Sequence, residues 1–228
     1  MIPKVFHRIW LGGKPMPKHF QEWGESWVAV NPGWEMKLWT EKNLPPTESP
    51  MSLEAACHLS QVSNIYRFEV LKHEGGVYVD TDMLALRPLD GLLEGVKGFV
   101  GKSRRGVGSA IMGCEQGDEV AVDLVQSTPT MKASESLSLG SHFVRNVLND
   151  HPGAWVEFPI PYMYPLDFYD WRKLWKAGHP LSAEVLRVRF PQAIACHFWS
   201  SRWHKPGFAP LNEISAKRCA CTIPKDNC

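Results

Sequence analysis

The sequence lacks the features that direct a chain into or across a membrane. Its first residues, Met1–Val5, have no charged stretch followed by the long apolar stretch that a signal peptide requires. It also has no run of about 18 apolar residues, the length that a membrane-spanning helix needs. These absences predict a soluble, cytoplasmic protein without a transmembrane segment.

A large excess of charge of either sign is missing too. The 25 Lys and Arg residues balance 24 Asp and Glu residues, which gives a formal net charge of +1. The chain therefore has no overall field that favours nucleic acid or an anionic membrane. A small basic cluster at residues 102–105 is the local exception.

Paired cysteine motifs and two common nucleotide-binding fingerprints are also absent. The six cysteines show no Cys-x-x-Cys spacing, which favours free buried thiols over a disulfide framework. Neither the Gly-x-Gly-x-x-Gly fingerprint nor the Gly-x-x-x-x-Gly-Lys loop occurs. The usual dinucleotide-binding and NTPase assignments are therefore disfavoured.

What the sequence does contain is typical of one α/β domain. The chain has 228 residues and is 44% hydrophobic, so we expect one domain at residues 1–210 and a polar tail at 211–228 that holds Cys219, Cys221 and Cys228. Strand-like runs alternate with helical patterns, which predicts a mainly parallel central sheet flanked by helices. The expected strands are 5–10, 34–39, 77–79, 98–101, 106–113 and 193–199; helices are expected near 17–30, 52–56, 60–74, 118–126, 136–148 and 168–176, and a loop at 159–165.

The most informative stretch joins a buried helix to a strand that ends in two carboxylates. Gly75 and Gly76 stop the helix, and residues 77–79 form a short β-branched and aromatic strand. Asp80 and Asp82 follow at its carboxyl end, where ligands bind in open α/β sheets. If the strand continues through them, the two side chains share one face and can hold Mg²⁺ or Mn²⁺. A strand-end turn, with acidic residues capping backbone amides, is the alternative.

Four motifs occur in a specific order along the chain. They are Ile2-Pro-Lys-Val-Phe-His7-Arg-Ile-Trp10, Ser63-Asn64-Ile-Tyr-Arg67, Gly75-Gly-Val-Tyr78-Val-Asp80-Thr-Asp82 and His197-Phe-Trp-Ser-Ser201-Arg-Trp203. In order and spacing they resemble glycosyltransferase family 32. That family includes yeast initiating mannosyltransferases, bacterial capsule enzymes and, more distantly, clostridial glucosylating toxins. The resemblance covers residues 2–90 and 193–203.

The resemblance implies a GT-A type, Rossmann-like domain that binds a nucleotide diphosphate sugar. A divalent cation, commonly Mn²⁺ and otherwise Mg²⁺, would lie between protein and diphosphate. A hexose would pass from a UDP- or GDP-linked donor to an acceptor with retention of configuration. The acceptor, whether a glycan, a protein or a modified nucleic acid, is not identified by any motif.

The resemblance also implies a role for each matching residue. Trp10 would help seat the base, and the donor would contact Ser63, Asn64, Arg67, Tyr78 and Asp80. The metal would be held by Asp82 and His197, together with Asp80. Ser201 and Trp203 would close over the diphosphate. Because breaking the sugar–phosphate bond leaves negative charge on the diphosphate, we expect Arg67, Asp80 and Asp82 to carry the catalytic function.

Other functions remain compatible with the residues. Asn64 stands where the family usually has Asp, which leaves the donor and the activity open. A metal-dependent phosphohydrolase or nuclease would also use Asp80, Asp82 and His197 to hold a cation. A nucleotide-sugar binding protein without catalysis is the third possibility.

Overall fold

The computed structural model describes residues 1–50, 53, 56, 59–104, 106–128, 140–167, 169–171, 173 and 182–200. These residues contain a six-stranded sheet in the order β2-β1-β3-β6-β5-β7. Its strands are β1 (Val5–Ile9), β2 (Glu35–Trp39), β3 (Gly76–Val79), β5 (Gly98–Ser103), β6 (Gly106–Cys114) and β7 (Val156–Phe158). Pairing is parallel for β1 with β2 and β3 and for β5 with β7, and antiparallel for β6 with β3 and β5. The predicted mainly parallel sheet is confirmed.

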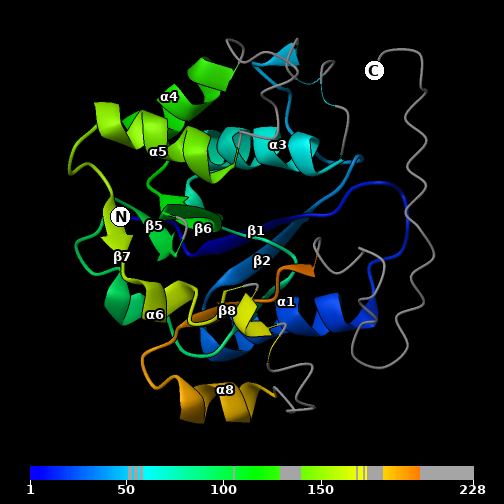
Figure 1. Ribbon diagram of the computed structural model, residues 1–228. Helices are drawn as coiled ribbons and strands as arrows, with labels where there is room; N and C mark the ends of the chain where they lie inside the picture. The colour runs from blue at the N-terminus through cyan, green and yellow to red at the C-terminus, as the bar shows by residue number, and fades with distance from the viewer. Residues whose placement is uncertain are drawn as a thin grey trace.

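Helices cover both faces of this sheet (Figure 1). On one face lie α3 (Leu59–Glu74), α4 (Glu119–Ser127) and α5 (Ser141–Asp150). Their apolar side chains form one buried cluster with sheet residues such as Tyr78 and Met112. On the other face lie α1 (Lys18–Val30) and the single-turn α6 (Ile160–Met163), which pack on Phe6, Val77 and Val79. Neighbouring residues of β3 thus face opposite layers, as the alternation of strand side chains requires.

The connection from α3 to β3 has the predicted glycine-after-helix form. Gly75 has φ +66° and Gly76 has φ +84°, a region that only glycine adopts without strain. A Cβ atom on Gly76 would also lie 2.7 Å from the carbonyl oxygen of Val5 in the neighbouring strand. The two glycines therefore end the helix and let β3 pair closely with β1.

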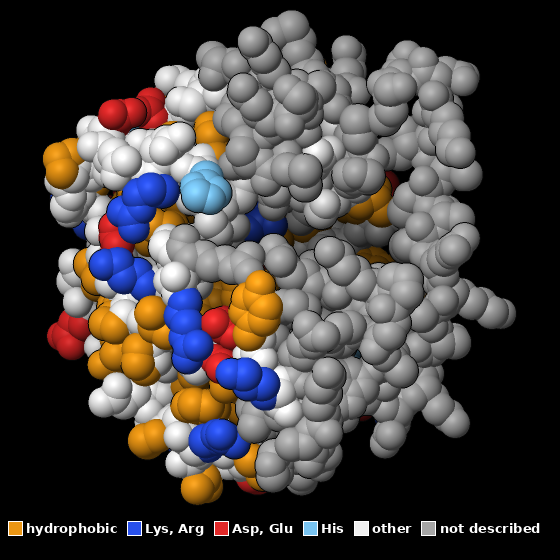
Figure 2. All heavy atoms as spheres, viewed as in Figure 1, with side chains coloured by type: hydrophobic (Ala, Val, Ile, Leu, Met, Phe, Trp, Pro, Cys, Tyr) orange, Lys and Arg blue, Asp and Glu red, His pale blue; other side chains and the backbone are white. Residues whose placement is uncertain are grey.

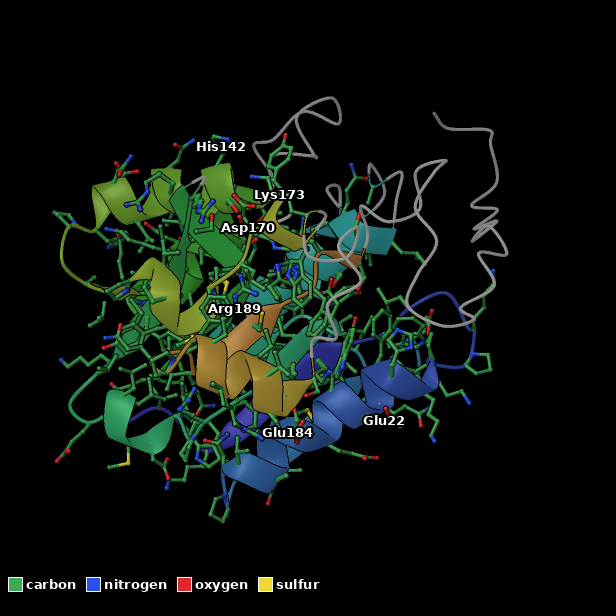
Figure 3. All side chains as sticks on the ribbon, turned by 60° about the horizontal axis from the view of Figure 1, so that its bottom comes forward. Glu22, His142, Asp170, Lys173, Glu184 and Arg189 are labelled. Carbon is green, nitrogen blue, oxygen red and sulfur yellow. The ribbon has the colours of Figure 1, made fainter. Side chains whose placement is uncertain are left out.

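A second, two-stranded sheet lies beyond the main one. It pairs β4 (Met83–Ala85) with β8 (Ala195–His197) in antiparallel fashion. Helix α8 (Ala183–Arg189) packs against it through Leu186, in a cluster that also contacts Trp23 of α1. Figure 3 shows α8, marked by Glu184 and Arg189, beside α1, marked by Glu22.

Several sequence expectations differ from these elements. Residues 160–163 form a turn of helix, although we expected a loop at 159–165, because Pro159 and Pro161 supply the backbone angles of a helix start. Strands β4 and β7 and helix α8 were not predicted. The α5 helix begins at Ser141, and the earlier part of the expected 136–148 helix, like the helix expected at 52–56, falls largely outside the described residues.

The remaining global expectations are tested only in part. Cys114 and Cys196 are free and buried, as predicted, while Cys57, Cys219, Cys221 and Cys228 lie outside the described residues. Every helix in the described ranges is too short or too polar to cross a bilayer. The boundary at residue 210 and the cytoplasmic location remain predictions.

The described basic residues of the 102–105 cluster, Lys102 and Arg104, are paired with acidic residues. Blue and red side chains adjoin on the face shown in Figure 2. Lys102 Nζ lies 3.1 Å from Glu157 Oε2, and Arg104 Nη1 lies 3.2 Å from Asp167 Oδ2. In the described part of this cluster the positive charge is therefore locally balanced, in line with the near-zero net charge.

Candidate active site

The Asp80-Thr81-Asp82 segment forms a turn at the carboxyl end of β3. The strand ends at Val79, and the amide of Met83 donates to the carbonyl of Asp80 at 3.1 Å. The strand therefore does not continue through Asp82, and the segment forms the strand-end turn that was the alternative, as Asp-rich segments favour. The turn nevertheless brings both carboxylates toward one place.

The small β4–β8 sheet brings His197 to the same place. Its register pairs His197 with Met83, the residue after Asp82, and the amide of Phe198 donates to the Asp82 carbonyl at 2.9 Å. Nε2 of His197 then lies 3.0 Å from Asp82 Oδ1 and 3.9 Å from Asp80 Oδ2. The amide of Ser200 donates to Asp82 Oδ2 at 2.7 Å. A segment more than a hundred residues away thus completes the site.

Helix α3 places the buried, positively charged side chain of Arg67 beside Asp80. Arg67 Nη2 lies 3.2 Å from Asp80 Oδ1, and Nη1 donates to the carbonyl of Ser109. The Tyr78 hydroxyl donates to the same Asp80 oxygen at 2.7 Å and lies 3.3 Å from Ser63 Oγ. Ser63 and Arg67 are four residues apart on the helix, so both face β3, as their spacing predicts.

Two residues near the turn were missed by sequence reasoning. Arg8 of β1 is 3% exposed, and its Nη2 donates to the carbonyls of Thr81 and Phe20, each at 2.7 Å. The sequence did contain a sign of this role, because Arg8 is a charged residue inside a predicted buried strand and Arg is rarely buried unless paired.

The second missed residue is Tyr164. Its hydroxyl accepts hydrogen bonds from the amides of Ala110 and Ile111 at 3.0 and 3.3 Å, and its ring packs edge-on against that of His197. Nothing in the sequence pattern pointed to Tyr164.

Burial and neighbouring charges set the ionisation of the site. Burial raises the pKa of Asp80, and Arg67 only partly opposes this effect. Burial also acts on Asp82, but the charge of His197 and the amide of Ser200 outweigh it, so the pKa of Asp82 is lowered. Burial disfavours the charged form of His197, yet Asp82 and Asp80 together raise its pKa. The proximity of His197 and Asp82 thus favours the charged form of each.

The same three side chains fit a divalent cation. Each of Asp80, Asp82 and His197 offers one ligand atom, and these atoms all lie within 4.8 Å of one another. Neighbouring ligands about 2.1 Å from an octahedral ion are roughly 3.0 Å apart, close to the Asp82–His197 separation. The nitrogen ligand suits a first-row transition ion such as Mn²⁺ better than Mg²⁺. Nδ1 of His197 is buried and, within the described residues, has no hydrogen-bond partner.

The other residues predicted to bind the donor have no described contact with Asp80, Asp82 or His197. Trp10 follows β1 at the same sheet edge, where its ring packs edge-on against Phe20 and its Nε1 donates to the Lys14 carbonyl at 2.7 Å. Asn64 is half-buried on α3 beside Ser63. Ser201 and Trp203 lie outside the described residues. The functional roles of all these residues remain predictions.

Comparison with known families gives the site its context. Residues 17–97, which include Asp80-Thr81-Asp82, match the family described as "Glycosyltransferase sugar-binding region containing DXD motif". Over these residues the chain is similar to the glycosyltransferases that contain this motif. The predicted family resemblance is thereby confirmed.

Individual relatives agree with this assignment. Inositol phosphoceramide mannosyltransferase 3 of Schizosaccharomyces pombe is 25% identical over 134 residues, which are 56% of this chain and 37% of the relative. The matched part of the chain spans well under half the length of three such curated relatives, at 37%, 20% and 40%.

Solved structures support the fold. The structure described as "PaToxG Glycosyltransferase" superposes with a TM-score of 0.54 and 16% identity, covering 66% of this chain and 70% of that one. Mouse xyloside xylosyltransferase 1 in its apo form gives a TM-score of 0.52 and 10% identity, covering 88% of this chain and 99% of that one. At such identities the likeness concerns the fold alone, and it confirms the predicted GT-A type, Rossmann-like architecture.

Proposed function

We propose that this glycosyltransferase moves a hexose from a UDP- or GDP-linked sugar to an acceptor, with a divalent cation and with retention of configuration. The observation that carries the proposal is the group of buried Asp82, His197 and Arg67 with half-buried Asp80 at the carboxyl edge of the sheet. Two carboxylates and an imidazole suit a cation, and an adjacent guanidinium suits a diphosphate. The relatives named as inositol phosphoceramide mannosyltransferases support a hexose as the transferred group.

The protein residues divide into two functions. Asp82 and His197, with Asp80, would hold Mn²⁺ or Mg²⁺; the chemistry supplied by such an ion is neutralisation of charge on the departing diphosphate. Arg67 is fixed by Asp80 and the Ser109 carbonyl, so its charge is preorganised and costs little reorganisation during the reaction.

The remaining residues would bind the donor. In this proposal Trp10 seats the base, Ser63, Asn64 and Tyr78 face ribose and sugar hydroxyls, and Ser201 and Trp203 cover the diphosphate. The acceptor, a glycan, a protein or a modified nucleic acid, contacts other parts of the chain.

The direct test is release of nucleoside diphosphate from a panel of UDP- and GDP-sugars, with and without Mn²⁺. Asp82→Asn should lower Mn²⁺-dependent turnover by about 10² or more, the scale for losing one preorganised electrostatic group. Asp123→Asn is the matched control, because Asp123 pairs with His151 outside the site. Equal turnover in wild type and Asp82→Asn would contradict the proposal. Cleavage of phosphomonoesters or nucleic acid without donor binding would instead indicate a phosphohydrolase, and binding without turnover a non-catalytic protein.

A further inference from the structure

A second group of side chains with metal-ligand chemistry lies at helix α3, away from the active site. Glu69 and His73 are one turn apart on α3, and Glu48 reaches them from the segment after β2. Residues two apart on a helix point about 200° from each other, so Glu69 faces away from the side on which Arg67 contacts Asp80. One ligand atom from each of Glu48, Glu69 and His73 lies within 4.8 Å of the other two.

One carboxylate oxygen of Glu69 lacks a hydrogen-bond partner among the described residues. The residue is 0% exposed, and its Oε1 accepts bonds from the Thr47 hydroxyl and the Glu48 amide, both at 2.8 Å. Its Oε2 is buried and has no hydrogen-bond partner among the described residues. A buried carboxylate oxygen without a hydrogen-bond partner lowers the stability of the folded protein unless a cation binds it.

Glu48 is arranged in the same way. Its Oε2 is held by Lys72 Nζ at 2.5 Å, while its Oε1 lies 3.5 Å from Nε2 of His73. The unpartnered Oε2 of Glu69 lies 3.7 Å from the same nitrogen. Each carboxylate thus has one oxygen fixed by the protein and the other directed toward His73, as in metal sites whose ligands are oriented by outer hydrogen bonds.

The distances favour an ion over direct hydrogen bonds. Hydrogen bonds from an imidazole to a carboxylate are about 2.7–3.2 Å long, shorter than the observed 3.5 and 3.7 Å. Ligands about 2.0–2.1 Å from a tetrahedral Zn²⁺ are roughly 3.3 Å apart, close to both separations. One imidazole and two carboxylates form a ligand set typical of Zn²⁺ and unlike the all-oxygen sets of Mg²⁺ and Ca²⁺.

We propose that Glu48, Glu69 and His73 form a Zn²⁺ site with water in the fourth position. The ion would join the segment at Thr47–Ser49 to α3, the helix that also carries Arg67 and Ser63. It would neutralise the buried Glu69 carboxylate, so its contribution is to stability and not to the transfer reaction. The proposal does not depend on the function proposed above.

The test counts bound Zn²⁺ by calorimetry in chelator-treated protein. Asp82→Asn serves as the background, because it disables the candidate active-site cation. This variant should bind one equivalent of Zn²⁺ and raise its Tm on binding. Adding His73→Ala should abolish both effects, whereas adding His151→Ala, which removes a histidine paired with a single carboxylate, should leave both unchanged.

Spectroscopy and folding controls complete the experiment. Co²⁺ in place of Zn²⁺ should give intense tetrahedral absorption that is lost with His73→Ala. Because His73 is 43% exposed, the variant should unfold at the same urea concentration as its parent when chelator is present. One equivalent of Zn²⁺ retained by the His73→Ala protein, or none bound by its parent, would overturn the proposal.

Discussion

His7 shows how one buried residue is held in a single ionisation state. It is 0% exposed, its Nε2 lies 2.9 Å from the Gly75 carbonyl, and its Nδ1 accepts from Trp39 Nε1 at 3.1 Å. A neutral ring with the proton on Nε2 satisfies both contacts, whereas a second proton on Nδ1 would face the indole donor. Burial accordingly lowers the pKa of His7 to about 4.

This arrangement predicts acid sensitivity of folding. Between pH 6.5 and 4 the unfolded chain binds a proton at His7 that the folded chain does not, so stability falls as the pH is lowered through this window. The loss should reach about 3 kcal/mol below pH 4, at 1.36 kcal/mol per pKa unit. Urea unfolding at a series of pH values measures it. His7→Gln should be less stable at pH 7.5 but lack this component, and identical pH slopes in the two proteins would contradict the assignment.

Arg67 is a second residue whose contacts depend on the planar, forked shape of its side chain. Its guanidinium contacts Asp80 and the Ser109 carbonyl at once and stacks 4.5 Å from the Tyr78 ring. Arg67→Lys keeps the charge but cannot fork between two acceptors or stack in the same way. We expect a loss of about 10² in kcat, the scale for one preorganised donor, with Mn²⁺ binding retained. Steady-state kinetics and Mn²⁺ titration measure the two quantities, and unchanged kcat would exclude a role in catalysis.

At the scale of elements, local patterns were predictable and long-range pairings were not. Helix α3, the glycine stop and β3 follow from residues that are neighbours in sequence, so periodicity and turn chemistry predicted them. Strand β4 has three residues and forms only because β8 pairs with it from the other end of the chain. The meeting of Asp82 with His197 therefore came from family resemblance and not from spacing.

The contact between α1 and β1 also depends on a single small residue. Gly24 of α1 is buried, and a Cβ atom there would overlap Nη1 of Arg8. Arg8 in turn holds the Thr81 carbonyl, between the two aspartates. A glycine inside a helix costs about 1 kcal/mol relative to Ala, so its presence here has a steric reason.

Gly24→Ala should therefore destabilise the protein despite the better helix propensity. Displacing Arg8 leaves two carbonyls without their donor, and overpacking of this kind costs about 1–3 kcal/mol. Urea unfolding measures the change. Glu25→Ala, at an exposed position of the same helix, should stay within about 0.5 kcal/mol of wild type. A Gly24→Ala protein as stable as wild type would show that Arg8 moves aside without cost.

At the scale of the whole molecule, the active site joins parts of the chain that are distant in sequence. Asp80 and Asp82 follow β3, Arg67 comes from α3, and His197 ends β8. Trp171 adds a further link, because its Nε1 donates to the His197 carbonyl at 2.7 Å. A ligand at this site therefore holds β8 and the β3–β4 turn together, and binding should stabilise the folded chain as a whole.

Bound Mn²⁺ should accordingly raise the unfolding temperature. A ligand at a hundredfold excess over its Kd contributes about 2.7 kcal/mol. For a domain of this size that corresponds to a rise of roughly 5–10 °C in Tm. Calorimetry with and without Mn²⁺ measures the shift; Asp82→Asn should abolish most of it, while Asp123→Asn should keep it. The added Mn²⁺ can also occupy the Glu48–Glu69–His73 group. The proteins with and without the Asp82 carboxylate are therefore also compared in a His73→Ala background, where the part of the Tm shift that depends on Asp82 should persist. An equal shift with and without the Asp82 carboxylate would place the stabilising ion elsewhere.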